Sequence, residues 1–176
     1  IDIIPSNSGL ALADIKFANS LDRDRILFYI IENIKEQYDY DYILIDCSPS
    51  LNYMTRNAVM TTDDIIIPVQ PEFFSIRGLD MLMKFIYQAQ KNNSALKIKG
   101  LLITMFQSNS KKHLEAIELL NEIYSDKVHI FKTLIPRGVA TSESVAYGQS
   151  VIEFDCNSKP AKAYIQLVNE EINGGE

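Results

Sequence analysis

One acidic residue, Asp46, follows a strand-forming segment and precedes a turn. Residues 42–45 form a short apolar run, Tyr-Ile-Leu-Ile, which is typical of a central parallel strand that is covered on both faces. Ser48 and Pro49 then interrupt the strand pattern. Because open α/β sheets bind ligands beyond the carboxyl ends of their strands, a carboxylate held there could act on a magnesium-bound water beside a phosphate. An Asp at this place is also common as a simple turn residue, and Asp46 alone does not decide between the two roles.

The other reactive side chains lack the spacing of a catalytic or metal centre. His113 and His129 have no Cys or acid at ligand spacing, so we interpret both as surface or structural histidines. No Gly-x-Ser-x-Gly elbow surrounds the serines that a hydrolase triad would need, Ser48, Ser50 and Ser144. A hydrolase triad and a zinc site are therefore disfavoured.

Length and composition fit one domain, residues 1–176, in a reducing compartment. The chain of 176 residues is long enough to bury a substantial core, and its 2 cysteines match no zinc spacing and give no disulfide framework. We therefore expect a cytoplasmic protein. No apolar run approaches the ~20 residues of a membrane helix, so no membrane role is expected. The net charge of −6 argues against general affinity for nucleic acid, although a local basic face remains open.

Strand and helix patterns alternate along the chain. Further apolar runs predict strands at residues 1–4, 65–69, 101–105 and 128–135. Helical periodicity and capping residues predict helices over residues 11–20, 25–37, 51–60, 75–92, 111–124, 142–147 and 160–172. Ser50 is the expected N-cap of the 51–60 helix, and residues 151–154 are expected to be extended. Together these patterns predict an α/β fold, a mostly parallel sheet with helices on both faces.

Four segments resemble one known family in collinear order. Residues 38–51 resemble the Walker B strand of ParA- and Soj-type partition ATPases, relatives of MinD, in which Tyr-Asp, a hydrophobic run, Asp, Pro and Ser-Leu follow one another. Residues 64–79 are similar to the family's strand that continues as Pro-Val-Gln, Glu, two aromatic residues and Gly-Leu. Residues 100–106 and 133–155 resemble the next strand and the C-terminal third. The likeness extends over nearly all 176 residues.

The family's phosphate-binding segment has no counterpart in the sequence. Its deviant Walker A loop, Lys-Gly-Gly-x-Gly-Lys-Thr, cradles the phosphates with backbone N–H groups and lysines. None of the 7 glycines is followed by Lys-Ser or Lys-Thr, and the family's Asp-x-Asp-x-x-Gln strand is absent too. The chain thus resembles the C-terminal two-thirds of a P-loop NTPase, truncated at the N-terminus. We expect the chain alone neither to bind ATP tightly nor to hydrolyse it.

The resemblance implies roles for specific residues in a complete family protein that uses ATP and Mg²⁺. Asp46 would be the Walker B carboxylate, the catalytic acid that supports Mg²⁺ through water. Met105, Phe106, Pro136 and Arg137 would lie in the two loops that flank the adenine. Pro136 could equally serve only to end a strand.

The resemblance also implies partners: a second copy of the chain, nonspecific DNA and a ParB-like centromere-binding protein. Arg137, Lys159 and Lys162 are the candidate DNA-binding residues, although Ala140 stands where the family often has a second arginine, and the lysines could equally be ordinary helix surface. The function this predicts is plasmid or chromosome partition by ATP-switched dimers. The alternatives are a non-catalytic interaction module that keeps the fold and a MinD-like positioning ATPase.

Overall fold

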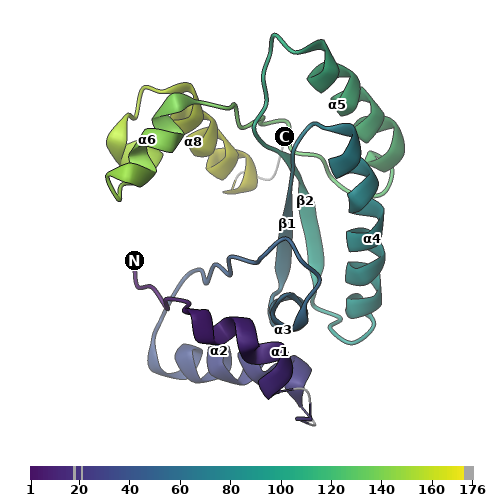
Figure 1. The fold of residues 1–176 in the computed structure, drawn as a ribbon, viewed down its shortest axis with the longest axis vertical. Helices are drawn as coiled ribbons and strands as arrows, with labels where there is room; N and C mark the ends of the chain where they lie inside the picture. Colours follow the sequence, from purple (N-terminus) through teal and green to yellow (C-terminus); the bar gives the residue numbers. More distant parts are fainter. Residues whose placement is uncertain (18, 21, 173–176) are drawn as a thin grey trace. The chain divides into compact units, whose positions relative to one another are not determined.

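The computed structural model describes residues 1–17, 19–20 and 22–172, and its contacts group the chain into two compact units (Figure 1). Unit 1 comprises Ile1–Asp63 and Leu82–Lys97, and unit 2 comprises Asp64–Met81 and Ile98–Glu176. The long helix α4 (Phe73–Gln90) contributes residues to both units. None of the helices in the described part of the chain, α4 included, combines the length and the apolar character needed to cross a membrane.

Unit 2 is built on a parallel sheet. Strands β1 (Asp64–Val69) and β2 (Lys97–Ile103) lie side by side (Figure 1), and Thr104 N donates to Val69 O at 2.9 Å where both strands end. Isolated parallel bridges join Leu101 to Ile130 and Phe106 to Pro136, so that residues 130–136 pair with the other edge of β2. The predicted α/β fold with a parallel sheet is confirmed.

β2 is the central strand of this sheet and is covered on both faces. Leu101 is 0% exposed, and Leu102, whose side chain points to the opposite face, packs in a buried cluster with Ala163 of α8 (Lys159–Ile172). Figure 1 shows α5 (Lys111–Tyr124) and α8 on opposite sides of the sheet. Burial of both faces explains why this strand reads as a continuous apolar run.

The segment predicted as a strand over residues 128–135 pairs with β2 and the residues that follow it through the two isolated bridges and through a bond from Ile135 N to Ile103 O at 2.9 Å, without forming a regular strand. Between the bridges, the backbone N–H groups of Lys132 and Thr133 donate to the Glu170 carboxylate of α8, at 2.7 and 3.0 Å. Pro136 has no N–H to donate. The prediction placed the segment correctly but was wrong about a regular strand, because the Glu170 carboxylate takes the N–H of Thr133, which a regular ladder would direct at β2 in alternation with the bond from Phe131 N to Leu101 O.

Unit 2 also contains α6 (Val139–Ala146) and α7 (Val151–Phe154). The prediction that residues 151–154 are extended was wrong, because they form the helical turn α7. Ser150 Oγ accepts a hydrogen bond from Glu153 N at 3.2 Å, and Glu153 Oε2 accepts one from Ser150 N at 3.0 Å. This reciprocal pair is a capping box, which favours a helical turn. The Ser-x-x-Glu signal for it is present in the sequence.

Unit 1 is helical. It contains the 3₁₀ turns η1 (Ser8–Leu12) and η2 (Arg23–Arg25) and the helices α1 (Ala13–Lys16), α2 (Ile26–Gln37) and α3 (Tyr53–Thr61). The helices predicted over residues 25–37 and 51–60 are confirmed as α2 and α3. The N-cap of α3 is Asn52, whose side chain accepts from Thr55 N at 3.1 Å, and not Ser50. The helix predicted over residues 11–20 ends early, at Lys16, and residue 18 lies outside the described residues.

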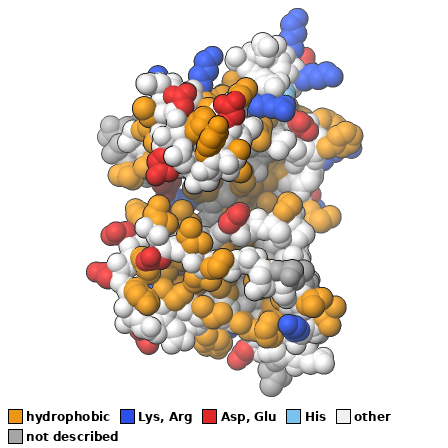
Figure 2. Space-filling view, turned by 60° about the vertical axis from the view of Figure 1, so that its left-hand side comes forward, with side chains coloured by type: hydrophobic (Ala, Val, Ile, Leu, Met, Phe, Trp, Pro, Cys, Tyr) orange, Lys and Arg blue, Asp and Glu red, His pale blue; other side chains and the backbone are white. Residues whose placement is uncertain are grey.

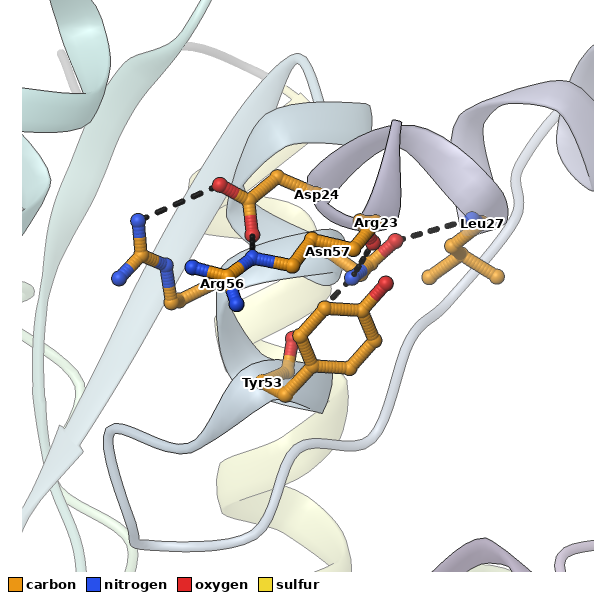
Figure 3. Close-up of polar contacts among 6 residues, drawn as sticks. All are labelled: Arg23, Asp24, Leu27, Tyr53, Arg56 and Asn57. Carbon is orange, nitrogen blue, oxygen red and sulfur yellow. Dashed lines mark hydrogen bonds and ion pairs between the residues drawn. The ribbon is translucent and has the colours of Figure 1, made fainter. Parts of the chain in front are cut away.

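A buried amide, Asn57, joins the start of α2 to α3 (Figure 3). Its side-chain oxygen accepts from Leu27 N at 3.1 Å, and its amide nitrogen donates to Arg23 O at 2.8 Å and to Tyr53 O at 3.2 Å. Asn57 is 1% exposed, so these bonds satisfy both polar ends of a side chain that has left water. The ion pairs around Asp24 in the same view are partly exposed and contribute little stability by comparison.

The strands predicted at residues 1–4 and 42–46 are not present in unit 1. Both segments are irregular, and Tyr42 and Leu44 are 80% and 93% exposed. Figure 2 shows many apolar side chains at the surface of the face that it presents. An apolar segment becomes a strand only through ladder hydrogen bonds, and the described part of unit 1 gives neither segment a strand neighbour. A side-chain hydrogen bond from Tyr40 Oη to Asp2 Oδ2, 2.5 Å long, connects the two regions instead.

Replacing Asn57 by Leu tests the buried clamp, which is the set of three hydrogen bonds by which the Asn57 side chain joins the start of α2 to α3. The substitution removes three hydrogen bonds and leaves the backbone groups of Arg23 and Leu27 without them, so we expect the free energy of unfolding to fall by about 2–4 kcal/mol in urea titrations. The control is Asn121→Leu, because Asn121 is exposed and donates to Ile117 O at 2.8 Å on its own helix. The control should change stability by less than about 0.5 kcal/mol. Equal losses in the two variants would contradict the clamp.

Candidate functional site

The two loops that the sequence predicts to flank the adenine, here called the base-side loops, meet at the carboxyl end of the sheet in unit 2. One follows β2 and carries Met105 and Phe106, and the other carries Pro136 and Arg137. Phe106 N donates to Ile135 O and Arg137 N donates to Phe106 O, both at 3.0 Å, and Phe106 forms a parallel bridge with Pro136. Met105 and Phe106 therefore lie beside Pro136 and Arg137, at the edge where α/β sheets bind ligands. The structure brings these four residues together, and their contact with adenine stays a prediction.

Met105 adopts a backbone conformation that the sequence did not signal. Its φ is 55°, in the left-handed region, and its side chain is 49% exposed. A non-glycine residue there costs about 1–2 kcal/mol, which persists only when the surrounding structure enforces it. The enforcing contacts are the ladder bond of Thr104 on one side and the two backbone bonds of Phe106 on the other. Such strain gathers at binding sites, so it adds weight to this loop.

The elements that carry the predicted DNA-binding residues are in contact. Arg137, Lys159 and Lys162 are all exposed. Gly138 follows Arg137 and packs against Pro160 of α8 so closely that an added Cβ would lie 2.5 Å from Pro160 Cγ. A larger residue at position 138 would push the turn and the helix apart. The turn of Arg137 and the first turn of α8 thus adjoin, and DNA binding by the three cations stays a prediction.

Glu170 fastens α8 to the segment that leads to Pro136. Its two carboxylate oxygens accept from Lys132 N and Thr133 N, and His129 Nε2 lies 3.8 Å from Oε1. Burial by itself would raise the pKa of Glu170, but the Thr133 side chain, the two N–H groups and His129 favour the anion, and the net pKa lies below its ordinary value. The anionic form is therefore the one that holds the helix in place.

Asp46 lies in unit 1, whereas the other candidate residues belong to unit 2. Asp46 is exposed and stands in an irregular segment, not at the tip of a strand. Mg²⁺ requires near-octahedral oxygen ligands, and the described residues contain no cluster of three or more His, Cys, Asp or Glu side chains that could hold a metal. A nucleotide-bound Mg²⁺ takes one or two carboxylates and fills its other positions with phosphate oxygens and waters, so the role of Asp46 at such an ion stays a prediction and we derive no catalytic step through a metal from this structure.

The two histidines both have structural contacts, as the sequence indicated. His129 contacts Glu170, and His113 Nδ1 accepts a hydrogen bond from Gln107 N at 3.2 Å, in the loop that follows Met105. Sequence reasoning did not connect His113 with the candidate site, because nothing in the sequence shows which backbone group an isolated histidine will contact.

A family model and two relatives each match more than half of this chain. The family model described as "AAA domain" matches residues 1–98. The sporulation initiation inhibitor protein Soj of Bacillus subtilis is 36% identical over 99% of this chain, which covers 68% of that protein. The chromosome-partitioning ATPase Soj of Treponema pallidum is 33% identical over 96% of the chain, which covers 66% of that protein.

A solved structure with the same fold is cobyrinic acid a,c-diamide synthase from Mycobacterium smegmatis with a bound ATP analogue and magnesium. It superimposes with a TM-score of 0.78 at 26% identity, over 97% of this chain and 63% of that protein. The chain thus spans about two-thirds of the length of these three proteins, from 63% to 68%.

The left-handed conformation of Met105 predicts an unusual order of variant stabilities. Met105→Gly should keep or raise the free energy of unfolding, by up to about 1 kcal/mol, because glycine adopts this φ without strain. Met105→Val should lose about 1–2 kcal/mol, because a branched Cβ fits this region poorly. Thermal or urea unfolding measures both.

The same substitutions at Met81 provide the control for Met105. Met81 is 70% exposed and lies within the helix α4. Here Gly should cost about 1 kcal/mol and Val less, which is the reverse order. The same order at both positions would argue against strain at Met105.

The lowered pKa of Glu170 predicts a pH-dependent contribution to stability. This contribution is complete above the unfolded pKa of about 4.5 and is lost as the pH falls through the lower folded pKa. Glu170→Gln should therefore lose about 1–3 kcal/mol at pH 7, and its difference from the wild type should shrink below about pH 4. Urea titrations at several pH values measure this.

Glu171→Gln is the matched control for the Glu170 variant. Glu171 is adjacent and pairs at 2.7 Å with Lys99, both side chains being about a third exposed. Its loss should stay below about 1 kcal/mol. A Glu170 variant as stable as this control at pH 7 would show that the carboxylate does not fasten α8.

Proposed function

Because the chain belongs to the ParA, Soj and MinD family of P-loop ATPases, we propose that it forms the greater part of an ATPase that partitions plasmids or chromosomes. The observation that carries this proposal is the extent of the match: 36% identity to Soj over 99% of the chain. Likeness of that extent includes the loops and helices of unit 2 as well as the segment around Asp46. We further propose that residues 1–176 form one domain, the C-terminal two-thirds of the family fold.

The base-side loops are the part of the nucleotide site that this chain would contribute. Met105 and Phe106 adjoin Pro136 and Arg137 at the carboxyl end of the sheet, where an adenine would find backbone groups and an apolar surface. Asp46 would be the carboxylate that faces Mg²⁺ in a protein that also carries a phosphate loop. The ATP analogue and magnesium bound to the M. smegmatis enzyme support ATP and Mg²⁺ as the ligands.

DNA binding would use phosphate contacts from one small basic surface. Arg137, Lys159 and Lys162 come from a turn and a helix end that adjoin, and the chain's net charge is −6. Affinity for DNA must then depend on these local cations and should weaken steeply with salt. A homodimer, a ParB-like centromere-binding partner and a cytoplasmic location complete the proposal, on the strength of the family.

The deciding experiment begins with the coding sequence directly upstream of Ile1. A Lys-Gly-Gly-x-Gly-Lys-Thr motif encoded there would support the ATPase, and an open reading frame without it would support a non-catalytic interaction module. The 176-residue chain and the complete gene product should then be compared by titration with ATP and Mg²⁺. We expect binding by the complete product only, and tight ATP binding by the 176-residue chain would contradict the proposal.

Salt-dependent DNA retention tests the partition role. In the ATP-bound complete product, combined alanine substitution of Arg137, Lys159 and Lys162 should weaken DNA binding and lower the slope of log K against log salt by about 2–3. The control replaces Lys111 and Lys112, two exposed lysines of α5, and should leave the slope within about 1 of its original value if these lysines make no phosphate contacts. ATP-dependent binding to anionic vesicles without DNA retention would favour the MinD-like alternative.

A further inference from the structure

A histidine from α5 holds the loop that carries Met105 and Phe106. His113 Nδ1 accepts from Gln107 N at 3.2 Å, and the imidazole lies against Phe106, with 6.5 Å between the ring centroids. Gln107 directly follows Phe106, whose backbone already pairs with the Pro136 segment. The histidine therefore fixes the next backbone donor along the same loop.

The position of His113 is set by the cap of its own helix. Ser110 is the N-cap of α5, and its backbone and side-chain oxygens lie 3.1 and 3.4 Å from His113 N. The imidazole thus projects from a capped first turn. Because Nδ1 is the acceptor of the hydrogen bond from Gln107 N, this nitrogen carries no hydrogen of its own in the contact. A lysine or an arginine at this position could not accept the Gln107 hydrogen bond.

The loop has one strained residue between two anchored ones. Thr104 N donates to Val69 O, Phe106 is fixed by two backbone bonds, and Met105 between them has φ 55°. Without an acceptor, the half-buried Gln107 N–H would lose its partner and the chain could leave this geometry at Gln107. His113 supplies that acceptor from a rigid helix.

We propose that His113 is a positioning residue for nucleotide recognition, which holds residues 105–107 in the conformation that presents Met105 and Phe106 to a purine base. His113 acts through the loop and does not touch the base. This inference rests on the proposed function, because only that function assigns a base to the loop. The contact between His113 and Gln107 is independent of it.

Two substitutions separate the hydrogen bond from the volume of the side chain. His113→Leu keeps the bulk and removes the acceptor, whereas His113→Asn retains an oxygen close to the position of Nδ1. Lys112→Leu, at the exposed neighbouring position, is the control. Hydrogen exchange of the 176-residue chain should show the Gln107 amide exchanging about fivefold faster in His113→Leu, and within about twofold of wild type in the other two. Unchanged exchange in His113→Leu would overturn the inference.

The second measurement uses the complete gene product and the ratio of its affinities for ATP and GTP. His113→Leu should lower the preference for ATP over GTP about fivefold, and His113→Asn should restore most of it. ATP and GTP differ only in the base, so the ratio of their affinities reports on the base-side loop alone. Loss of folding alone would reduce both affinities and would not change their ratio. If the complete wild-type product binds ATP, an unchanged ratio of the ATP and GTP affinities in His113→Leu would overturn the nucleotide role.

A complete wild-type product that binds neither nucleotide would refute the proposed function and with it the role of His113 in base recognition. Hydrogen exchange at Gln107 would then still decide whether His113 holds the loop. The failure of the function and the failure of the histidine contact thus give different results.

Discussion

The pairing of β2 with residues 130–136 is the constraint on which the candidate site depends. Parallel bridges join Leu101 to Ile130 and Phe106 to Pro136, with one more residue between the bridges on the 130–136 side, and the second bridge places Phe106 beside Pro136. A shift of one residue would turn Leu101, 0% exposed, towards the opposite face of the sheet and would separate the two loops. Core burial and loop geometry are therefore maintained by the same backbone hydrogen bonds.

The same constraint explains which strands could be predicted from the sequence. Residues 65–69 and 101–103 read as apolar runs and are strands, because each has a neighbour in the ladder. Residues 42–46 carry the same signal, yet Leu44 is 93% exposed. An apolar run reports a tendency to be buried between layers, and the sequence pattern does not show whether a neighbouring strand is there to pair with it. The position of Asp46 could therefore not be predicted from its own segment.

Some hydrogen bonds between polar side chains and the backbone can be predicted from the sequence, and others cannot. The Ser150 and Glu153 capping box lies within four consecutive residues, and its motif can be recognised in the sequence. Glu170 bonds the backbone of Lys132, 38 positions away, and Asn57 bonds Leu27 across 30 positions. No local pattern encodes such pairs, because they form only after the helices have packed. The contact of His113 with the loop at Gln107 and the strain at Met105 became visible for the same reason only in the structure.

The two sides of a nucleotide site have different energetic roles, and in the proposed function this chain contributes the side that contacts the base. Binding a triphosphate depends mainly on charge, through backbone donors, lysines and a metal ion, and a chain of net charge −6 offers no general attraction to it. Each hydrogen bond to a base contributes only about 0.5–1.5 kcal/mol, because water competes for the same groups. A base that lacks the matching group leaves a polar atom of the loop without a partner, which costs more than the bond contributed. In the proposed function the loops at Phe106 and Pro136 would therefore select the base, while affinity would come from the groups that contact the phosphates.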